Sequence, residues 1–262
     1  MRILYGLALT LICSIANAAI TDFSTWTLVE DPPNANFSAT QTAASATLSA
    51  GGPIPAGVDI GFQSVNGTTV ASSTGGYFFD PSTDFSIAID YDWTFNSGAG
   101  VLGLGFGIGE DSDGMNSAGV AMATSNGSPF LTFGGAARVN DNDQAPLVLG
   151  TATSTLSGSL FVSYEAASGD VLLGAATTTG AASPTVAGTY SGIQNQWNNE
   201  ALLASFFIRS DGPAGAQWLG GDADAVFSNF RVLSGSAVAI PEPSSSVALG
   251  LVGVWVLIRR RR

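Results

Sequence analysis

Residues 85–95 read Phe-Ser-Ile-Ala-Ile-Asp-Tyr-Asp-Trp-Thr-Phe, and this stretch decides the fold. Large apolar side chains stand at every second position, from Phe85 through Tyr91 to Phe95, with smaller or polar residues between them. Successive side chains of a β-strand point to opposite sides, so a period of two residues is typical of a strand with one buried face. The stretch therefore predicts a long strand that covers a hydrophobic core.

The segments that follow predict two hairpins. After a turn-forming run at 96–100, residues 101–108 alternate apolar residues with glycine, which is typical of a strand closely approached by another backbone. The 85–95 and 101–108 strands are therefore expected to pair as a hairpin. Residues 160–165 and 171–173, which flank a turn at 168–170, predict the second hairpin.

Composition extends the β pattern to the whole body of the chain. Residues 201–209 predict a buried strand and residues 225–233 a last alternating strand, although residues 194–203 are also compatible with one short helix. Glycine accounts for 33 of 262 residues, about 13% against a usual ~7%. No segment of 20–50 residues repeats, which argues against a solenoid or propeller. The sequence predicts an all-β fold with a single antiparallel β-sandwich of the jelly-roll type.

The charge balance excludes several classes of function. All eight basic residues are arginines, and the chain has no histidine. Residues 19–240 contain three arginines and 19 acidic residues, a net charge of 3 − 19 = −16. A nucleic-acid partner is excluded because phosphate binding requires a basic surface. Without histidine, neither a Ser-His-Asp triad nor a histidine-ligated zinc site can be built.

Residues 1–18 have the features of a secretory signal peptide. Arg2 precedes an apolar stretch, and Ala16-Asn17-Ala18 forms a small-x-small cleavage site. The one cysteine, Cys13, lies within this segment, so the exported chain would have no disulfide. The alternative is an uncleaved N-terminal anchor, which the short apolar stretch disfavours.

The last 23 residues, 240–262, form a second targeting segment. Pro241, Glu242 and Pro243 precede an apolar run at 247–258, and the chain ends in Arg259, Arg260, Arg261 and Arg262. As a helix the apolar run would be about 18 Å long, which is short for a membrane core of ~30 Å. Because positive flanks stay in the cytoplasm, the arginines predict a short transmembrane helix with the body of the protein outside.

This tail resembles the PEP-CTERM sorting signal of Gram-negative-type bacteria, in which a Pro-Glu-Pro motif, a short helix and a basic cluster occur in this order. The resemblance implies Sec-type export of a precursor tethered to the inner membrane. It also implies recognition of residues 241–243 by an exosortase, a membrane-embedded transpeptidase. The product would reach the cell envelope, the cell surface or the extracellular matrix. An ordinary short membrane anchor is the alternative.

The body, residues 19–239, resembles concanavalin A-like sandwiches and their laminin-G-like relatives. The resemblance is carried by residues 77–80, 103–108, 159–173 and 227–232. It implies a domain whose concave sheet or rim loops bind glycans, commonly with Ca²⁺.

One acidic segment is a candidate calcium site. Glu110, Asp111, Asp113 and Asn116 follow a predicted strand and offer the hard oxygen ligands that Ca²⁺ prefers. Residues 141–143 and 222–224 each contain two further aspartates that could join or replace this site. The alternative is a solvated acidic turn without metal.

A glycoside hydrolase is the alternative function, because its chemistry needs only two carboxylates and no histidine. Glucanases of this sandwich family have a Glu-x-Asp-x-x-Glu strand motif. The nearest segment here begins at Glu110 and has Ser112 where the aspartate would stand. This departure argues against hydrolysis.

Trp197 and Trp218 are candidate sugar-binding residues. Both stand among polar or turn-forming residues, which predicts exposed rings on which a sugar could stack, although both could instead be packed in the interior. Taken together, the sequence predicts a non-enzymatic, exported protein that is structural or binds an extracellular polysaccharide. An inert spacer or adhesive subunit is a third possibility.

Overall fold

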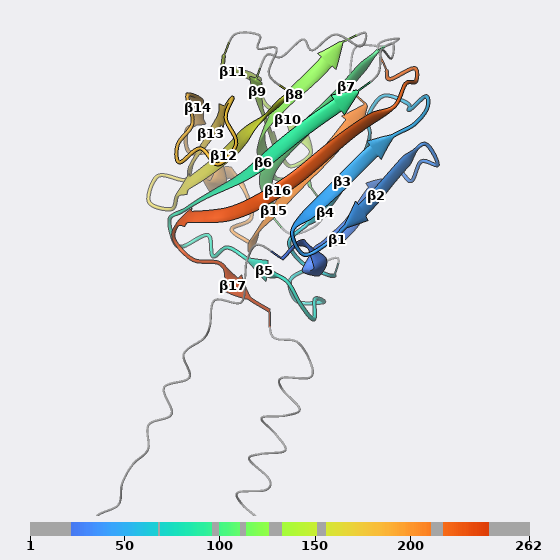
Figure 1. The fold of residues 1–262 in the computed structure, drawn as a ribbon. Coiled ribbons are helices and arrows are strands. Elements are labelled where there is room, and N and C mark those ends of the chain that lie inside the picture. The colour runs from blue at the N-terminus through green and yellow to red at the C-terminus, as the bar shows by residue number, and fades with distance from the viewer. Residues whose placement is uncertain are drawn as a thin grey trace, which may run out of the picture.

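The computed structural model describes residues 22–67, 69–95, 100–110, 114–125, 133–150, 156–210 and 217–240 (Figure 1). Within these residues the chain consists of strands and two short 3-10 turns, η1 (Phe23–Thr25) and η2 (Gln194–Gln196). The strands form two large antiparallel sheets that face each other across one hydrophobic core. The prediction of an all-β antiparallel sandwich is confirmed.

The two sheets divide the described strands almost equally. The eight-stranded sheet has the order β1 (Thr27–Asp31), β4 (Val58–Gln63), β15 (Leu202–Ser210), β7 (Val101–Glu110), β8 (Ser117–Ser125), β9 (Phe133–Val139) and β10 (Asn142–Asp143), and β11 (Leu147–Val148) also pairs with β9. The seven-stranded sheet has the order β14 (Val186–Tyr190), β13 (Asp170–Ala176), β12 (Ser157–Glu165), β6 (Phe85–Phe95), β16 (Ala223–Ser234), β3 (Ser45–Ala50) and β2 (Phe37–Gln41).

Strand β6 is central in the seven-stranded sheet and has the bounds that its alternating sequence predicts. Its inward residues Ile87, Ile89 and Trp93 are fully buried, whereas Asp92 and Thr94 on the other face are exposed. It pairs with β12 on one side and β16 on the other. The two-residue period of β6 therefore determines which of its side chains face the core.

The predicted hairpin between residues 85–95 and 101–108 is wrong. Strand β7 lies in the opposite sheet, where it pairs with β15 and β8. Both edges of β6 are occupied, and both β6 and β7 present large apolar side chains to the same core, so the chain crosses between sheets instead of turning back. The second predicted hairpin is confirmed, because β12 and β13 pair from Ser159↔Ala176 to Glu165↔Asp170.

The alternative of one helix at 194–203 is also wrong. Residues 194–196 form only the 3-10 turn η2, and strand β15 begins at Leu202. The β-rich sequence from Leu202 onward is drawn into the sheet by pairing with β4 and β7.

An aromatic cluster joins the two sheets in the core. The Trp26 ring centroid lies 5.2 Å from that of Phe206 on β15 and 5.2 Å from that of Phe230 on β16. Phe206 also packs against Phe227, with centroids 4.5 Å apart. Aromatic pairs at these separations stabilise a core beyond the area they bury.

Strand β16 contains a bulge that the simple alternation of its sequence does not predict. Its register against β6 shifts between Ser228 and Arg231, and Asn229 has a φ of 50°. As a result Phe227 and Phe230, three residues apart, both point into the core, while Arg231 turns to the outer face. Asparagine tolerates this left-handed conformation better than most residues.

The first and last described elements of the chain lie at the same end of the sandwich. Strand β17 (Val238–Ala239) pairs with β5 (Tyr77–Phe78), and the Ile240 amide donates to the Gly76 carbonyl oxygen at 2.8 Å. Trp26, just after η1, contacts the Tyr77 ring with centroids 5.8 Å apart. Both η1 and β17 therefore lie at one end of the sandwich (Figure 1).

Candidate functional site

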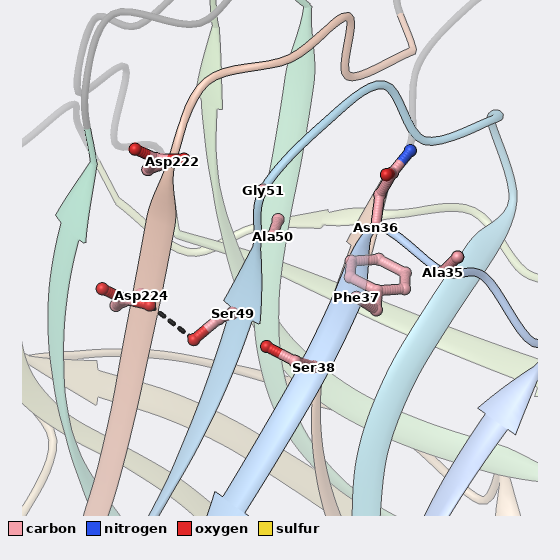
Figure 2. Close-up of a pocket in the computed structure, with 9 residues that line it drawn as sticks. All are labelled: Ala35, Asn36, Phe37, Ser38, Ser49, Ala50, Gly51, Asp222 and Asp224. Atoms are coloured by element: carbon pink, nitrogen blue, oxygen red, sulfur yellow. Dashed lines mark hydrogen bonds between the residues drawn. The ribbon is translucent and has the colours of Figure 1, made fainter.

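A polar hollow lies at the opposite end of the seven-stranded sheet, where β2 and β16 begin and β3 ends. It has a volume of about 390 Å³ and is lined by the ends of these three strands and the residues beside them (Figure 2). The polar side chains of the lining are Asn36, Ser38, Ser49, Asp222 and Asp224. The remaining lining residues are Ala35, Phe37, Ala50 and Gly51.

Internal contacts hold part of this hollow in place. The Ser49 hydroxyl donates to the Asp224 Oδ1 atom at 2.5 Å (Figure 2). The Asn36 side-chain amide donates to the Pro53 carbonyl oxygen at 2.7 Å. Asp222 and Asp224 are both exposed. The hollow offers hydroxyl, amide and carboxylate groups to a ligand.

The outer face of the eight-stranded sheet is a second candidate surface. The inward residues of β7 are Leu102, Leu104, Phe106 and Ile108, so the outward positions are the glycines at 103, 105, 107 and 109. Across the sheet these glycines face Arg209, Phe207, Ser205 and Leu203 on β15, and Ala123, Ala121, Gly119 and Ser117 on β8. The centre of this face consequently has few side chains that rise above the backbone.

Phe207 is the aromatic side chain among the described outward positions of β15, β7 and β8. It pairs with Gly105 on one side and Gly61 on the other, and it is partly exposed. A Cβ atom at Gly105 would lie only 2.4 Å from Cζ of the Phe207 ring, so the tip of the ring rests over the glycine backbone. A partly exposed aromatic ring on a flat, glycine-lined surface can stack against the apolar face of a sugar.

One ion pair borders this face. Arg209 Nη1 lies 3.5 Å from Asp59 Oδ2, and both side chains are about one-third exposed. The outward positions of β15, β7 and β8 that the structure describes contain no aspartate or glutamate. The two acids that a glycosidase requires are therefore not found on these three strands.

The predicted calcium ligands Glu110 and Asn116 are brought together, but in a structural role. Glu110 is only 2% exposed, and its carboxylate accepts hydrogen bonds from Asn116 Nδ2 at 2.9 Å and from the Asn198 and Glu200 amides at 2.7 and 2.8 Å. The Asn116 Oδ1 atom accepts from the Asn140 amide at 2.7 Å. The Glu110 and Asn116 oxygens therefore hold the segments around residues 116, 140 and 198–200 together.

The other predicted metal ligands do not complete a site in the described residues. Asp111 and Asp113 lie outside them, so that part of the calcium prediction stays a prediction. Asp141 and Asp143 both pair with Arg138, at 2.9 and 3.1 Å. Within the described part of the chain, no group of three or more acidic residues is arranged to hold a metal ion.

The prediction that Trp197 and Trp218 present exposed rings is wrong. Trp197 is 7% exposed and its indole N–H donates to the Arg138 carbonyl oxygen at 3.1 Å. Trp218 is fully buried, and its amide donates to the Ser210 hydroxyl at 2.8 Å. Both indoles are therefore packed in the interior, where they cannot bind sugar.

The sorting motif Pro241, Glu242 and Pro243, the apolar run and Arg259 to Arg262 lie outside the described residues, as does the predicted signal peptide. Among the residues that the structure does describe, no helix is long and apolar enough to cross a membrane.

A charged cluster on the outer face of the seven-stranded sheet was not foreseen. Asp90 accepts hydrogen bonds from Ser159 Oγ, Arg231 Nη1, Asn229 Nδ2 and the Gly180 amide at 2.5 to 2.9 Å. Burial alone would raise the pKa of Asp90, but these four donors outweigh it and hold that pKa below its ordinary value. Arg231 also donates to the Ala181 carbonyl oxygen, so the cluster fastens the 177–185 loop over the sheet.

Comparison with known proteins supports the fold. No protein-family model matches the chain, and no curated protein matches it by sequence.

A functionally unknown protein from Saccharomyces cerevisiae matches with a TM-score of 0.53 and 13% identity, over 82% of this chain and 100% of that one. An alginate lyase from Klebsiella pneumoniae matches with a TM-score of 0.51 and 9% identity, over 82% and 97% of the two chains. An alginate lyase from Alteromonas sp. 272 matches with a TM-score of 0.50 and 12% identity, over 84% and 96%. The chain thus shares its sandwich fold with polysaccharide lyases.

Proposed function

We propose that this protein is an exported, non-enzymatic component of the cell surface or extracellular matrix that binds a polysaccharide on the outer face of its eight-stranded sheet. The observation that carries the proposal is the Phe207 ring, which is partly exposed and rests over Gly105 beside the small outward residues of β7 and β8. The fold shared with alginate lyases supports a glycan-related role. The absence of acidic residues at the described outward positions of β15, β7 and β8 favours binding over catalysis.

The sorting half of the proposal rests on the sequence of the tail. An exosortase-type enzyme would recognise Pro241, Glu242 and Pro243, after Sec-type export had placed the body outside a Gram-negative-type inner membrane. The pairing of β17 with β5 fixes the chain to the body up to Ile240, directly before the motif. Intact-mass measurement of the surface protein should show a chain that ends near residues 241–243, and a chain that retains Arg262 would contradict the processing.

Binding is tested with the full chain in a polyoxyethylene detergent, by affinity electrophoresis against a panel of soluble polysaccharides. Phe207→Ala should weaken binding about tenfold or more, which corresponds to about 1.4 kcal/mol of lost contact with one aromatic ring. Gly105→Ala should also weaken it, because the new methyl group displaces the ring tip from its resting place. Each measurement is made with and without a calcium chelator, which also tests the predicted calcium requirement.

Gly103→Ala is the matched control. It adds the same methyl group to the same face of β7, but its nearest contact is Met122 O at 3.4 Å and the ring is not touched. Binding should be unchanged. Equal binding by the wild type, Phe207→Ala and Gly105→Ala would overturn the proposed site.

A glycoside hydrolase is the second candidate, and its support is the pair of exposed carboxylates, Asp222 and Asp224, in the polar hollow of Figure 2. Glu110 does not fit this chemistry because its buried carboxylate is engaged by three N–H donors. Release of reducing sugar that is lost in both Asp222→Asn and Asp224→Asn would establish the enzyme. No release from any polysaccharide that the protein binds would exclude it for those glycans.

A further inference from the structure

Positive charge is scarce in the described chain and is all engaged in ion pairs. The described residues contain three arginines, Arg138, Arg209 and Arg231, and no lysine or histidine. Arg138 pairs with Asp141 and Asp143, Arg209 pairs with Asp59, and Arg231 pairs with Asp90. With a net charge of 3 − 19 = −16 over residues 19–240, the field around the body is negative.

Neither candidate surface offers an unneutralised cation. On the outer face of the eight-stranded sheet, the charge of Arg209 is balanced by one aspartate, and Arg138 contacts two. The polar hollow of Figure 2 is lined by two carboxylates and has no basic residue in its lining. A ligand that is recognised through its own negative charge has no partner on either surface.

We infer that the polysaccharide is uncharged, an inference that rests on the proposed function. Proteins bind carboxylate and sulfate groups through arginine or lysine, often in bidentate geometry. Here those groups would meet arginines that already have aspartate partners, and a long-range field of the same sign. A cationic sugar would find no carboxylate beside Phe207 at the described outward positions of β15, β7 and β8. An uncharged polysaccharide instead needs an apolar ring and hydroxyl or amide groups. Phe207 and Ser205 provide a ring and a hydroxyl group at partly exposed, outward positions of β15.

The test compares three classes of probe on the full chain. The background variant has Arg259, Arg260, Arg261 and Arg262 replaced by glutamine, so that the tail adds no positive charge. The probes are laminarin and galactomannan as neutral glycans, polygalacturonate as a polyanion and chitosan as a polycation. Salt is set at 0.01 M and at 0.15 M, where the Debye length is about 30 Å and about 8 Å.

The inference expects binding to a neutral glycan that changes less than about twofold with salt, because no charge pairing contributes. Binding of polygalacturonate or chitosan in preference to both neutral glycans, sensitive to Phe207→Ala, would overturn the inference but leave the proposed function standing. Binding of no probe, or binding indifferent to Phe207→Ala, would mean that the proposed function itself has failed.

A gain-of-binding variant tests the role of the ion pairs. Asp141→Asn with Asp143→Asn removes both acids that contact Arg138, which lies on the outer face of β9. Polygalacturonate should then bind at low salt at least about tenfold more tightly, the effect of one new charge-assisted contact.

The matched control is Asp92→Asn with Glu165→Gln. It makes the same change in net charge at two exposed residues of the seven-stranded sheet, and neither residue pairs with an arginine. This control should gain no binding. Equal gain in both double variants would show that overall charge, and not arginine masking, excludes polyanions, and no gain in either would overturn the masking of Arg138.

Discussion

Asp90 joins several segments of the chain through the hydrogen bonds of one carboxylate. Its side chain is 7% exposed, and its two oxygens receive four hydrogen bonds from β12, β16 and the 177–185 loop. The bulge at Asn229 makes this possible, because it brings both Asn229 Nδ2 and the Arg231 guanidinium to the outer face. One carboxylate thereby ties a loop and two strands to the middle of the sheet.

Asp90→Asn should lower the free energy of unfolding by about 2–4 kcal/mol at pH 7, because the partly buried Arg231 loses its counter-charge. The folded pKa of Asp90 lies below its ordinary value, so its contribution is fully present above that ordinary value, about 3.9. The contribution is then lost as the pH falls through the folded pKa. Urea unfolding from pH 7 to pH 2 should therefore show a difference between wild type and variant that is constant at high pH and shrinks in acid.

Asp92→Asn, at an exposed position of the same strand, serves as the control and should change stability by less than about 0.5 kcal/mol. Hydrogen exchange gives an independent readout, because the Gly180 amide loses its acceptor charge and should exchange faster in Asp90→Asn. A difference in stability that stays the same down to pH 2 would contradict a role for the ionised carboxylate.

Single residues also show where sequence reasoning reaches its limit. Trp197 and Trp218 have polar or turn-forming neighbours, which predicted exposure. The direction of a ring also depends on partners far away in sequence, such as Arg138, whose carbonyl oxygen accepts from the Trp197 indole. Phe207 was overlooked because the run 202–208 is apolar at nearly every position. The available signal was parity: if Phe206 and Ile208 face the core, Phe207 faces out.

At the scale of elements, strand β7 has large apolar side chains on its core face and glycines at positions 103, 105, 107 and 109 of its outer face. Its glycines differ in what surrounds them. An added Cβ at Gly107 would lie 2.7 Å from the Ala118 carbonyl oxygen and 2.9 Å from Gly119 Cα, both backbone atoms of β8, whereas Gly103 has nothing nearer than 3.4 Å. The backbones of β7 and β8 therefore approach each other closely at Gly107 and less closely at Gly103.

Gly107→Ala should destabilise the protein by about 1–3 kcal/mol, because β7 and β8 must separate to admit the methyl group. Gly103→Ala on the same strand should be neutral or slightly stabilising, since alanine restricts the unfolded chain more than glycine does. Urea unfolding with unchanged m-values measures both. Equal effects of the two substitutions would show that glycine content alone, and not the contact with β8, sets the stability of this strand.

The positions of the strands were predicted better than the pairing between strands. The two-residue period gave β6 its bounds because burial of one face is a local property, and the β12–β13 hairpin followed from its short turn. The β6–β7 pairing was predicted from proximity in sequence and failed, because a strand that crosses to the opposite sheet has the same local pattern as one that turns back. The glycine alternation of β7 indicated close packing but could not say against which strand.

At the scale of the whole molecule, β16 joins segments from the two ends of the chain. It is 12 residues long and lies between β6 and β3, so that Ala223 pairs with Ala50 on one side and with Phe95 on the other. Without it, β2 and β3 would have no link to the rest of their sheet, and the core would lose Phe227 and Phe230. Pairings between residues so far apart in sequence form late, because the loop must close before they contribute.

The sandwich should therefore fold only after β16 is available. A chain that ends at residue 221 should show no cooperative thermal transition and should expose apolar surface, because the seven-stranded sheet is divided and its core face is uncovered. A chain that ends at residue 240 keeps every described strand, including the β17–β5 pair, and should melt at the temperature of the full chain. Circular dichroism with thermal unfolding distinguishes the two, and a cooperative transition in the shorter chain would show that β1 to β15 form a folding unit of their own. If the chain is exported as proposed, this order would keep the body unfolded until its last long strand has emerged, just before the proposed sorting motif.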